Sequence, residues 1–202
     1  MLKLNGVRLI RFEPEYHIAK IYEWYYSGDY QEFFREYPQC PSASEMAMAS
    51  QGKTFMIIKE DDNRIIGLVR FFNENNIARN FELGILIDKE LQKQNFAFNA
   101  LKIFLNWKFN YCNFYKAKMK VIAKNDRLCN ILDKFSAFRE GGQGAVLKKE
   151  SFYEGKFHDV AVYAIFKTDF NQLYLKDFEQ DEARLETPIL KDVSHGRLSI
   201  RE

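Results

Sequence analysis

The chain has 202 residues, of which 47% are hydrophobic and 29% charged, so it can bury a full-sized core and is not a disordered chain. Thirty Lys and Arg against 28 Asp and Glu give a net charge of +2, which excludes a protein whose whole surface is built for nucleic acid. No apolar run approaches the ~18 residues of a membrane-spanning helix, and the N-terminus lacks a signal-peptide pattern. Three cysteines at long spacings match neither a disulfide framework nor a metal site. We therefore expect a soluble, cytoplasmic protein with no bound metal and no nucleic-acid or membrane partner.

The hydrophobic period changes several times along the first half of the chain. Segments that alternate apolar and polar residues favour strands, and segments with apolar residues three or four apart favour helices. Strands are expected at residues 7–12, 54–59, 65–72 and 78–87. Short helices are expected at residues 17–26, 29–34 and 45–50. Polar turns at residues 61–64 and 73–76 join the last three strands, which therefore form an antiparallel meander.

The second half alternates helices and strands. Residues 96–109 are almost entirely apolar except for a narrow stripe that includes Asn99, Lys102 and Asn106, so they predict a helix buried against a sheet. A strand, a helix and two strands are expected after it, at residues 116–122, 126–135, 145–153 and 158–166. A strand–helix–strand unit requires a crossover connection. The fold class is therefore α/β, of the α+β type, with a mixed and mostly antiparallel central sheet flanked by helices.

The end of the chain has a different composition. Residues 168–202 contain eight acidic and five basic residues, with apolar residues scattered among them. We expect one domain at residues 1–167 and an acidic tail at residues 168–202, with a short helix at residues 170–183. Such a tail is interpreted as a dimer or partner arm, or simply as a mobile segment.

The lysines are concentrated in one part of the chain. Residues 91–125 contain no Asp or Glu and seven lysines. This segregation suits an anionic ligand, although a solvated basic face explains the charge equally well. The segment opens at a strand-to-helix junction, where the free N–H groups of a first helical turn bind phosphate. A diphosphate ligand is the hypothesis; nucleic-acid phosphates would favour Arg and exposed stacking aromatic residues instead.

Three stretches resemble the GNAT superfamily of N-acetyltransferases, in the right order, over residues 7–168. Residues 82–87 read ELGILI and run into Gln92-x-x-Asn95-x-Ala97, like the family's fourth strand and pyrophosphate loop. Residues 125–141 resemble its Asn, helix and Gly-Phe-x-x-Glu-Gly run. Residues 153–163 resemble its closing hairpin. The branch that they resemble most is that of the ribosomal-protein-alanine and related small-substrate acetyltransferases.

The resemblance implies acetyl-CoA as donor and an amine as acceptor, with the pantetheine between two splayed strands. The cofactor-binding residues that it implies are Ile85, Leu86, Ile87, Gln92, Lys93, Gln94, Asn95, Phe96, Ala97, Phe98 and Asn125. Asn125 is explained equally well as a helix cap. The acceptor pocket would be formed by the first helices, including Trp24, Tyr25 and Tyr26.

The chain departs from the family pattern at three places, one of which is the family's Gly-Phe pair, which reads Ala137-Phe138 here after a one-residue insertion. Asn95 stands where the loop usually has Gly, although Asn tolerates unusual dihedral angles better than most residues. Leu132 stands where many members have a Tyr that acts as general acid.

Glu82 is the candidate general base, because a carboxylate within an apolar strand would lie near the donor with a raised pKa; an ion pair with a nearby Lys or Arg is the alternative. Tyr153 is the candidate acid, or a packing residue. The backbone N–H of Ile85 or Leu86 would polarise the thioester carbonyl, by resemblance.

Two groups outside the loop have structural interpretations. His158 with Asp159 resembles an orienting pair but is more typical of a structural one. No cysteine has a partner that would activate it, and Cys129 is interpreted as a small core residue.

These residues predict an N-acetyltransferase that moves acetyl from acetyl-CoA to a primary amine by direct transfer. The alternative is a catalytically degenerate GNAT-fold protein with a binding or structural role, acting through its tail. A homodimer or a tail-bound protein partner is possible in either case.

Overall fold

The computed structural model describes residues 2–28, 30–34, 41–135, 138–139, 146–153 and 155–178. Its strands are β1 (Leu2–Leu4), β2 (Val7–Arg11), β3 (Thr54–Lys59), β4 (Ile65–Asn75), β5 (Asn80–Ile87), β6 (Lys116–Ile122), β7 (Phe138–Arg139), β8 (Leu147–Tyr153) and β9 (Lys156–Phe166). Its α-helices are α1 (Pro14–Tyr26), α2 (Gln31–Phe34), α3 (Ala43–Ser50), α4 (Phe96–Asn106), α5 (Asp126–Lys134) and α6 (Lys167–Tyr174). A 3₁₀ turn, η1 (Lys89–Leu91), precedes α4, and a π-helical turn, η2 (Trp107–Tyr111), follows it.

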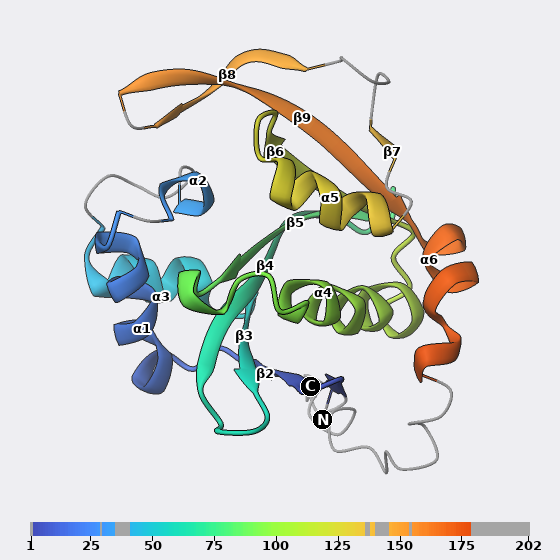
Figure 1. The fold of residues 1–202 in the computed structure, drawn as a ribbon, viewed down its shortest axis with the longest axis horizontal. Helices are drawn as coiled ribbons and strands as arrows, with labels where there is room; N and C mark the ends of the chain where they lie inside the picture. Colours follow the sequence, from blue (N-terminus) through green and yellow to red (C-terminus); the bar gives the residue numbers. More distant parts are fainter. Residues whose placement is uncertain are drawn as a thin grey trace, which may run out of the picture.

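The strands form one mixed sheet in the order β1-β2-β3-β4-β5-β6-β9-β7, with β8 paired to β9. Neighbouring strands are antiparallel except for β5 and β6, which are parallel and are joined through α4. The expected meander is present as β3, β4 and β5. The predicted fold class, a mixed and mostly antiparallel sheet flanked by helices, is confirmed (Figure 1).

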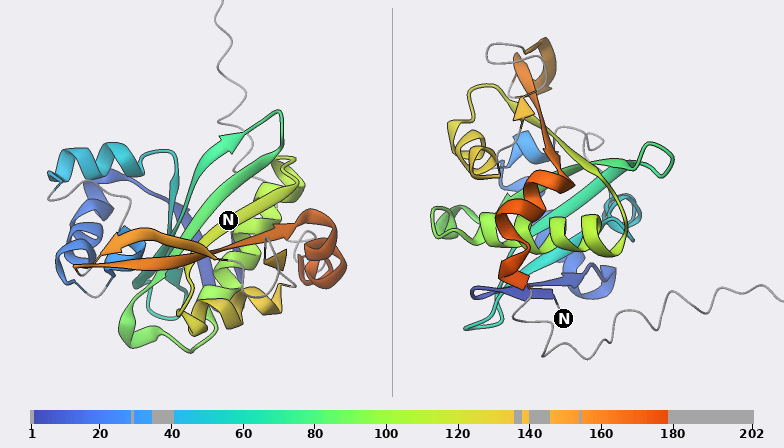
Figure 2. Two further views of the ribbon diagram at one scale, coloured as in Figure 1. Left: turned by 90° about the horizontal axis from the view of Figure 1, so that it is seen from above. Right: turned by 90° about the vertical axis from the view of Figure 1, so that its right-hand side faces the viewer.

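Helices cover both faces of the sheet, so the molecule has two hydrophobic cores. The larger core lies between the sheet and α4, α5 and α6, and includes Phe81, Phe104 and Phe109. The smaller core joins the opposite face to α1, α2 and α3 around Trp24 and Met46. The end of β9 next to β8 lies above α2, and its other end reaches α6 (Figures 1 and 2).

Several boundaries differ from the prediction by a few residues, and two of these differences have a conformational reason. The turn expected at residues 73–76 is instead an irregularity within β4, where Asn73 takes a φ of 51°, and the chain reverses after Asn75. Helix α1 begins at Pro14, because proline at the first helical position lacks an N–H that would be unpaired there anyway. Strand β1 was not expected, since three residues are too short to show a period.

The polar stripe on α4 is buried rather than exposed. Asn99, Lys102 and Asn106 are 8%, 5% and 4% exposed. Polar partners from other elements make this possible: Lys102 pairs with Asp177 after α6, and Asn106 accepts from Asn110 in η2. The tail helix was expected at residues 170–183, and α6 is found at Lys167–Tyr174. Residues 179–202 of the predicted tail lie outside the described residues.

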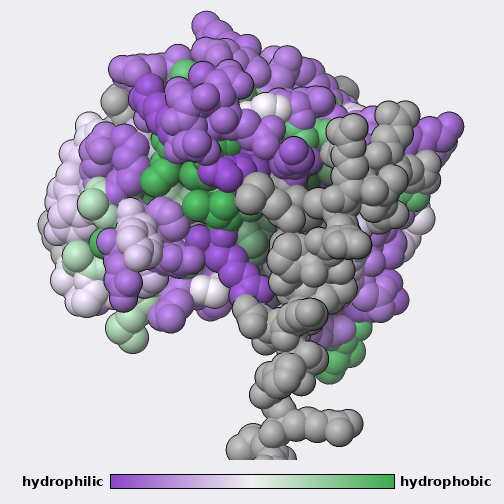
Figure 3. Space-filling view, turned by 90° about the horizontal axis from the view of Figure 1, so that it is seen from below, coloured by the Kyte–Doolittle hydropathy of each residue, from purple (hydrophilic) through white to green (hydrophobic). Residues whose placement is uncertain are grey.

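In the part of the chain that the structure describes, no helix is long and apolar enough to cross a membrane. Figure 3 shows one face of the molecule, where most described residues are hydrophilic and hydrophobic residues gather in a hollow near the middle.

Candidate functional site

A pocket opens where β5 and β6 separate. The two strands pair only from Asn80 to Glu82 and from Lys116 to Lys118, so β5 has no hydrogen-bonded neighbour on this side from Leu83 onward. The cavity has a volume of about 740 Å³ and lies among β4, β5, β6, the loop before α4, and α5. The separation of two parallel strands therefore creates a site within the sheet.

The pocket is lined from both faces of the sheet. Leu83 and Ile87 belong to the core beneath α4. Gly84 and Leu86 point the other way, where Leu86 joins the core beneath α1–α3 and Gly84 faces the ring of Phe33. A ligand in this pocket would pass from one face of the sheet to the other.

The loop before α4 suits a phosphate group. Lys93 and Asn95 have left-handed backbone conformations, with φ of 74° and 61°, and Asn95 is the N-cap residue of α4. The Asn95 side chain makes no capping hydrogen bond to the helix, so it does not occupy the N–H groups of the first turn. Gln92 fixes the loop by donating from Nε2 to the carbonyl of Ile87 at 3.0 Å. Turns of this kind form anion-binding concavities.

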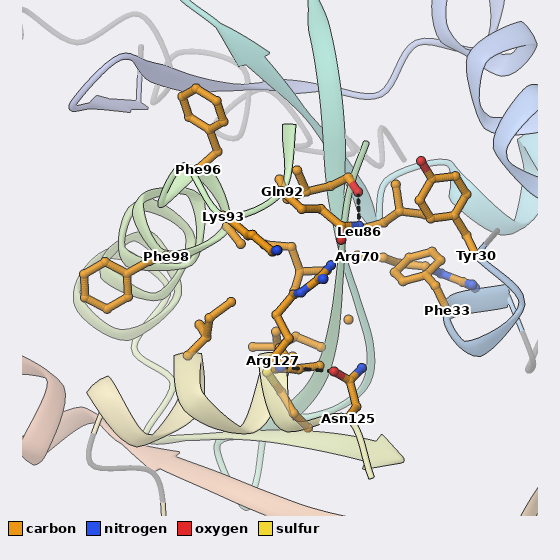
Figure 4. A pocket seen from close by; sticks show the side chains of 18 of the residues that line it. Tyr30, Phe33, Arg70, Leu86, Gln92, Lys93, Phe96, Phe98, Asn125 and Arg127 are labelled. Atoms are coloured by element: carbon orange, nitrogen blue, oxygen red, sulfur yellow. Dashed lines mark hydrogen bonds between the residues drawn. The ribbon is translucent and has the colours of Figure 1, made fainter. Parts of the chain in front are cut away.

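Basic side chains dominate the pocket lining. The described residues that line it include six basic side chains and one acid, Asp126. The six are Arg70, Lys93, Lys120, Lys124, Arg127 and Lys134. Lys93 from the loop and Arg127 from α5 point into the cavity from opposite sides (Figure 4). The electrostatics therefore favour an anion.

The lysine-rich segment serves two purposes. Lys93, Lys120 and Lys124 line the pocket. Lys102 and Lys108 are instead buried in ion pairs with Asp177 and Glu74. Part of the local charge excess is thus structural, which sequence periodicity does not reveal.

Residues 7–136, more than half of the chain, match the family described as the acetyltransferase (GNAT) domain. The chain belongs to this family.

Curated relatives of this GNAT chain include two spermidine N(1)-acetyltransferases. That of Vibrio cholerae is 25% identical over 114 residues, which are 56% of this chain and 64% of the relative. That of Escherichia coli K12 is 27% identical over 113 residues, which are 56% of this chain and 59% of the relative. The match thus spans less than two thirds of either relative. These relatives do not support the narrower assignment to the ribosomal-protein-alanine branch.

Solved structures show the same GNAT fold. A spermidine N-acetyltransferase from Vibrio cholerae, in complex with CoA and spermine, has a TM-score of 0.72 at 21% identity, covering 82% of this chain and 98% of that one. A GNAT-family acetyltransferase from Bacillus anthracis has a TM-score of 0.69 at 17% identity, covering 83% and 98%.

The predicted cofactor-binding residues are brought together. All of them line the pocket except Gln94, which is exposed beside it. Asn125 also caps α5, since its side chain accepts from the N–H of Leu128 at 3.1 Å. The two readings of Asn125 are therefore compatible.

Glu82 does not line the pocket, but it lies on the strand that forms the pocket wall. It stands opposite Phe72 on β4 and Lys118 on β6, and it faces the same side as Gly84. Its Oε2 is buried and has no hydrogen-bond partner among the described residues. The ion pair that was the alternative for Glu82 is absent from the described part of the chain.

The candidate acids differ in how they are placed. Tyr153 pairs through its backbone with Lys156 at the tip of the β8–β9 hairpin, and its side chain lies outside the described residues. Leu132 is fully buried in the larger core, so a general acid does not come from that position. Tyr30 contributes a phenol to the pocket lining. Its hydroxyl accepts from the N–H of Lys89 at 2.7 Å.

The predicted acceptor residues lie behind the pocket wall. Trp24, Tyr25 and Tyr26 do not line the pocket, and Trp24 is 2% exposed. Trp24 and Tyr25 instead pack edge-on against Tyr30 and Phe34, at 6.3 and 5.4 Å between ring centroids. The wall itself is formed by Tyr30 and Phe33. Phe33 fits because Gly84 lacks a side chain: a Cβ there would be 3.1 Å from the ring.

Several lining residues were not predicted from the sequence. Besides Tyr30 and Phe33, the basic ones among them are Arg70, Lys120, Lys124, Arg127 and Lys134. The separation of β5 and β6 brings them together from four distant segments. The lysine excess pointed toward Lys120 and Lys124, and the family resemblance at residues 125–141 covered Arg127 and Lys134 without assigning them a role.

Cys112, Cys129 and Asp159 have contacts typical of structural residues. Burial raises the pKa of the Cys112 thiol, which disfavours a reactive thiolate. Cys129 packs against the larger core, as expected, and Cys40 lies outside the described residues. A hydrogen bond from Lys148 lowers the pKa of Asp159, which also accepts from the N–H of Lys149 and so ties β8 to β9. Among the described residues no group of three or more His, Cys, Asp or Glu is arranged to hold a metal ion.

Proposed function

We propose that the protein transfers the acetyl group of acetyl-CoA directly to a primary amine. The observation that carries this proposal is the pocket between β5 and β6, lined from both faces of the sheet and by the basic loop before α4. A long donor with phosphates at one end and a reactive acyl group at the other matches this shape and charge.

The residues present fit acetyl-CoA. The first-turn N–H groups of α4, with Lys93 and Arg127, would hold the diphosphate. The unpaired edge of β5 at residues 83–87 would hold the amide-bearing pantetheine through backbone hydrogen bonds. Asn95 adopts the left-handed conformation that the usual glycine would provide, so this departure from the family does not deform the loop.

The first experiment is calorimetric titration of the protein with acetyl-CoA at low and moderate salt. We expect micromolar binding that weakens as salt rises, since exposed charges are screened. Lys93→Met and Arg127→Met should each weaken binding about tenfold, whereas Lys53→Met, on an exposed lysine outside the pocket, should not. If the wild-type protein shows neither heat nor a thermal shift with millimolar acetyl-CoA, the proposal fails.

In this proposal Glu82 is the general base that removes the ammonium proton, directly or through water. The amine then attacks the thioester carbonyl, whose developing oxyanion accepts a hydrogen bond from the backbone N–H of Ile85 or Leu86. As the tetrahedral intermediate collapses, the nitrogen loses its second proton to solvent, the C–S bond breaks, and the thiolate takes a proton from an acid, which solvent then reprotonates. The Oε2 of Glu82, buried and without a hydrogen-bond partner among the described residues, supports its role. Direct transfer, rather than a covalent enzyme intermediate, is supported by the absence of a cysteine from the described residues that line the pocket.

Substitution tests the base. We expect Glu82→Gln to lower kcat by roughly 10²–10⁴ while the Kd for acetyl-CoA stays within about twofold of wild type. Glu60→Gln serves as a control because Glu60, in the turn directly after β3, does not line the pocket. If Glu82→Gln and Glu60→Gln have the same kcat, Glu82 is not the general base.

Two phenols compete for the role of acid. We propose Tyr153, from the closing hairpin, and Tyr30 is the alternative because it lines the pocket. The phenol that supplies the proton should, when changed to Phe, remove the alkaline limb of the pH–rate profile. The other Tyr→Phe variant should keep that limb.

We infer that the acceptor is an aliphatic polyamine. The curated relatives are named for spermidine. The segment at residues 13–36, which leads to the pocket wall, has six acidic residues against two basic ones. Arg70 and Lys120 line the pocket on the side that Glu82 faces, and these basic side chains would repel further ammonium groups there. Only the reacting amine would therefore enter the pocket, and the remaining ammonium groups would stay outside, near the acidic segment.

A panel of acceptors tests this inference. Spermidine and spermine should give a higher kcat/KM than a peptide with an N-terminal alanine or an amino sugar. A preference for the peptide would overturn the polyamine assignment and favour the ribosomal-protein-alanine branch, and would leave the acetyl-CoA proposal intact.

A further inference from the structure

Helix α6 lies outside the matched GNAT domain but packs on the phosphate-binding end of the pocket. The GNAT match ends at residue 136, and α6 begins at Lys167. Tyr174 near the end of α6 contacts Phe98 and Phe135, with 5.7 and 5.4 Å between ring centroids. Phe98 belongs to the first turn of α4, the turn that would face the phosphates. Figures 1 and 2 show α6 at the end of the molecule beside α4 and α5.

A buried ion pair holds α6 against α4. Lys102 is 5% exposed and donates from Nζ to Oδ2 of Asp177 at 2.7 Å. Its ammonium group also lies 5.1 and 5.5 Å from the ring centroids of Phe98 and Tyr174. A charge this deeply buried needs its partner, so the pair fixes the end of α6 relative to α4.

Polar contacts continue from α6 to the loop. The hydroxyl of Tyr174 donates to the backbone carbonyl of Lys134, the last residue of α5. The Lys134 side chain lines the pocket, and its Nζ lies 3.5 Å from Oδ1 of Asn95 and 5.2 Å from the Phe98 ring centroid. Asn95 is the left-handed N-cap residue of α4. One line of contacts therefore runs from Tyr174 through Lys134 to the phosphate-binding loop.

We propose that Tyr174 is a positioning residue for the donor: by holding Lys134 at the rim of the pocket, it sets the loop that binds the CoA phosphates. This inference rests on the proposed use of acetyl-CoA. Tyr174 does not touch the donor. It acts through Lys134, whose ammonium group is free to contact phosphate because Asn95 offers it a neutral oxygen rather than a carboxylate.

Tyr174→Phe is the direct test, because it removes the hydroxyl and keeps the ring that packs on Phe98 and Phe135. We expect the KM and Kd for acetyl-CoA to rise about three- to tenfold, as for the loss of one hydrogen bond. The kcat and the KM for the amine should stay within about twofold of wild type. Tyr115→Phe is the control, since Tyr115 is a 42% exposed phenol packed on Phe166 and does not line the pocket.

A double-mutant cycle separates positioning from packing. Lys134→Met should weaken acetyl-CoA binding by a similar factor, and the double variant should be no weaker than Lys134→Met alone. Asp177→Asn, which breaks the pair with Lys102, should also raise the KM for acetyl-CoA. A merely structural Tyr174 would lower the melting temperature without changing the acetyl-CoA KM, or would add its effect to that of Lys134→Met.

The outcomes for the two proposals are distinct. If the wild-type protein binds acetyl-CoA and Tyr174→Phe binds it with the same Kd, the role of Tyr174 is overturned and the proposed function stands. Absence of acetyl-CoA binding in the wild-type protein overturns both.

Discussion

Asn95 has the left-handed backbone conformation that glycine usually provides, and its side chain also contacts the ammonium group of Lys134. Its φ of 61° lies in the left-handed region, where a non-glycine residue other than Asn or Asp is strained. This explains why the loop retains its form without the usual glycine. This tolerance could be predicted from the sequence, because it is a property of asparagine as a residue type.

Substitutions at Asn95 should separate conformation from contact. Asn95→Gly and Asn95→Ala both lose the contact with Lys134, but only Ala is strained. We expect Asn95→Ala to unfold at a lower urea concentration, by about 1 kcal/mol relative to Asn95→Gly, and to bind acetyl-CoA more weakly. Equal urea midpoints and equal calorimetric Kd values for the two variants would contradict this explanation.

His17 makes the stability of the protein depend on pH. Its Nδ1 accepts from the N–H of Glu13 at 2.8 Å at the start of α1, and burial lowers the pKa of the imidazole against the opposing effect of Glu13. The unfolded chain therefore binds a proton more readily than the folded one. The stabilisation is complete above the ordinary pKa of about 6.5 and is lost as the pH falls from there through the lowered pKa of the folded state.

Urea unfolding between about pH 8 and pH 5 measures this effect. The free energy of unfolding should decrease over the acidic half of that range in the wild-type protein. His17→Gln should flatten that part of the curve, since Gln does not titrate. A variant curve parallel to that of the wild type would assign the pH dependence to other groups.

Among the elements, η2 connects the end of α4 to β4 through a buried charge. The Lys108 side chain is 3% exposed and pairs with Glu74, which is 34% exposed. Its ammonium group lies 3.6 and 4.8 Å from the ring centroids of Phe71 and Phe114. The aromatic rings and the carboxylate together replace the water that the ammonium group has lost.

The two partners of this pair should differ in their effects on stability. Glu74→Gln leaves a buried cation without its carboxylate and should cost on the order of 3 kcal/mol of unfolding free energy. Lys108→Met places a flexible thioether among aromatic rings and leaves Glu74 able to reach water, so it should cost less than half as much. Urea denaturation, with Glu60→Gln as control, checks the order, and the reverse order would refute this account.

The elements that the sequence predicts well are those with a clear period. The strands expected at residues 54–59 and 116–122 have those bounds in the structure: β6 alternates because one face is buried, and β3 is a short apolar run buried on both faces. Charge, helix start and family resemblance all pointed to the loop before α4, and this loop lines the pocket; its binding of phosphate stays a prediction. The pocket wall at Tyr30 and Phe33 was not predicted, because nothing local distinguishes these rings from the packed rings of Trp24 and Tyr25. Their role comes from the gap between β5 and β6, which is a property of the sheet.

At the scale of the whole molecule, the described part of the predicted tail belongs to the body of the protein. Phe170 of α6 is fully buried in the larger core. The boundary between a domain at residues 1–167 and a tail from residue 168 stays a prediction. Self-association also stays a prediction; one similar structure, a spermidine N-acetyltransferase from Vibrio cholerae, is described as dodecameric. The comparisons give no support to a partner bound by the tail.

Truncation tests whether the protein acts as an enzyme or through its tail. A chain ending at residue 178 keeps α6 and should retain the melting temperature and the acetyl-transfer rate of the full chain. A chain ending at residue 166 loses Phe170 and Tyr174 and should be less stable by roughly 3 kcal/mol or more. If removal of residues 179–202 abolishes the biological activity while Glu82→Gln does not, the binding-protein alternative is correct.

The pocket that passes through the sheet has a consequence for the kinetics. A donor bound from the α4 side and an amine arriving from the α1–α3 side do not compete for one entrance, so neither has to leave before the other binds. Initial-rate plots should then intersect rather than run parallel. Free CoA should inhibit competitively with acetyl-CoA but not with the amine. No covalent acetyl-enzyme should accumulate between turnovers.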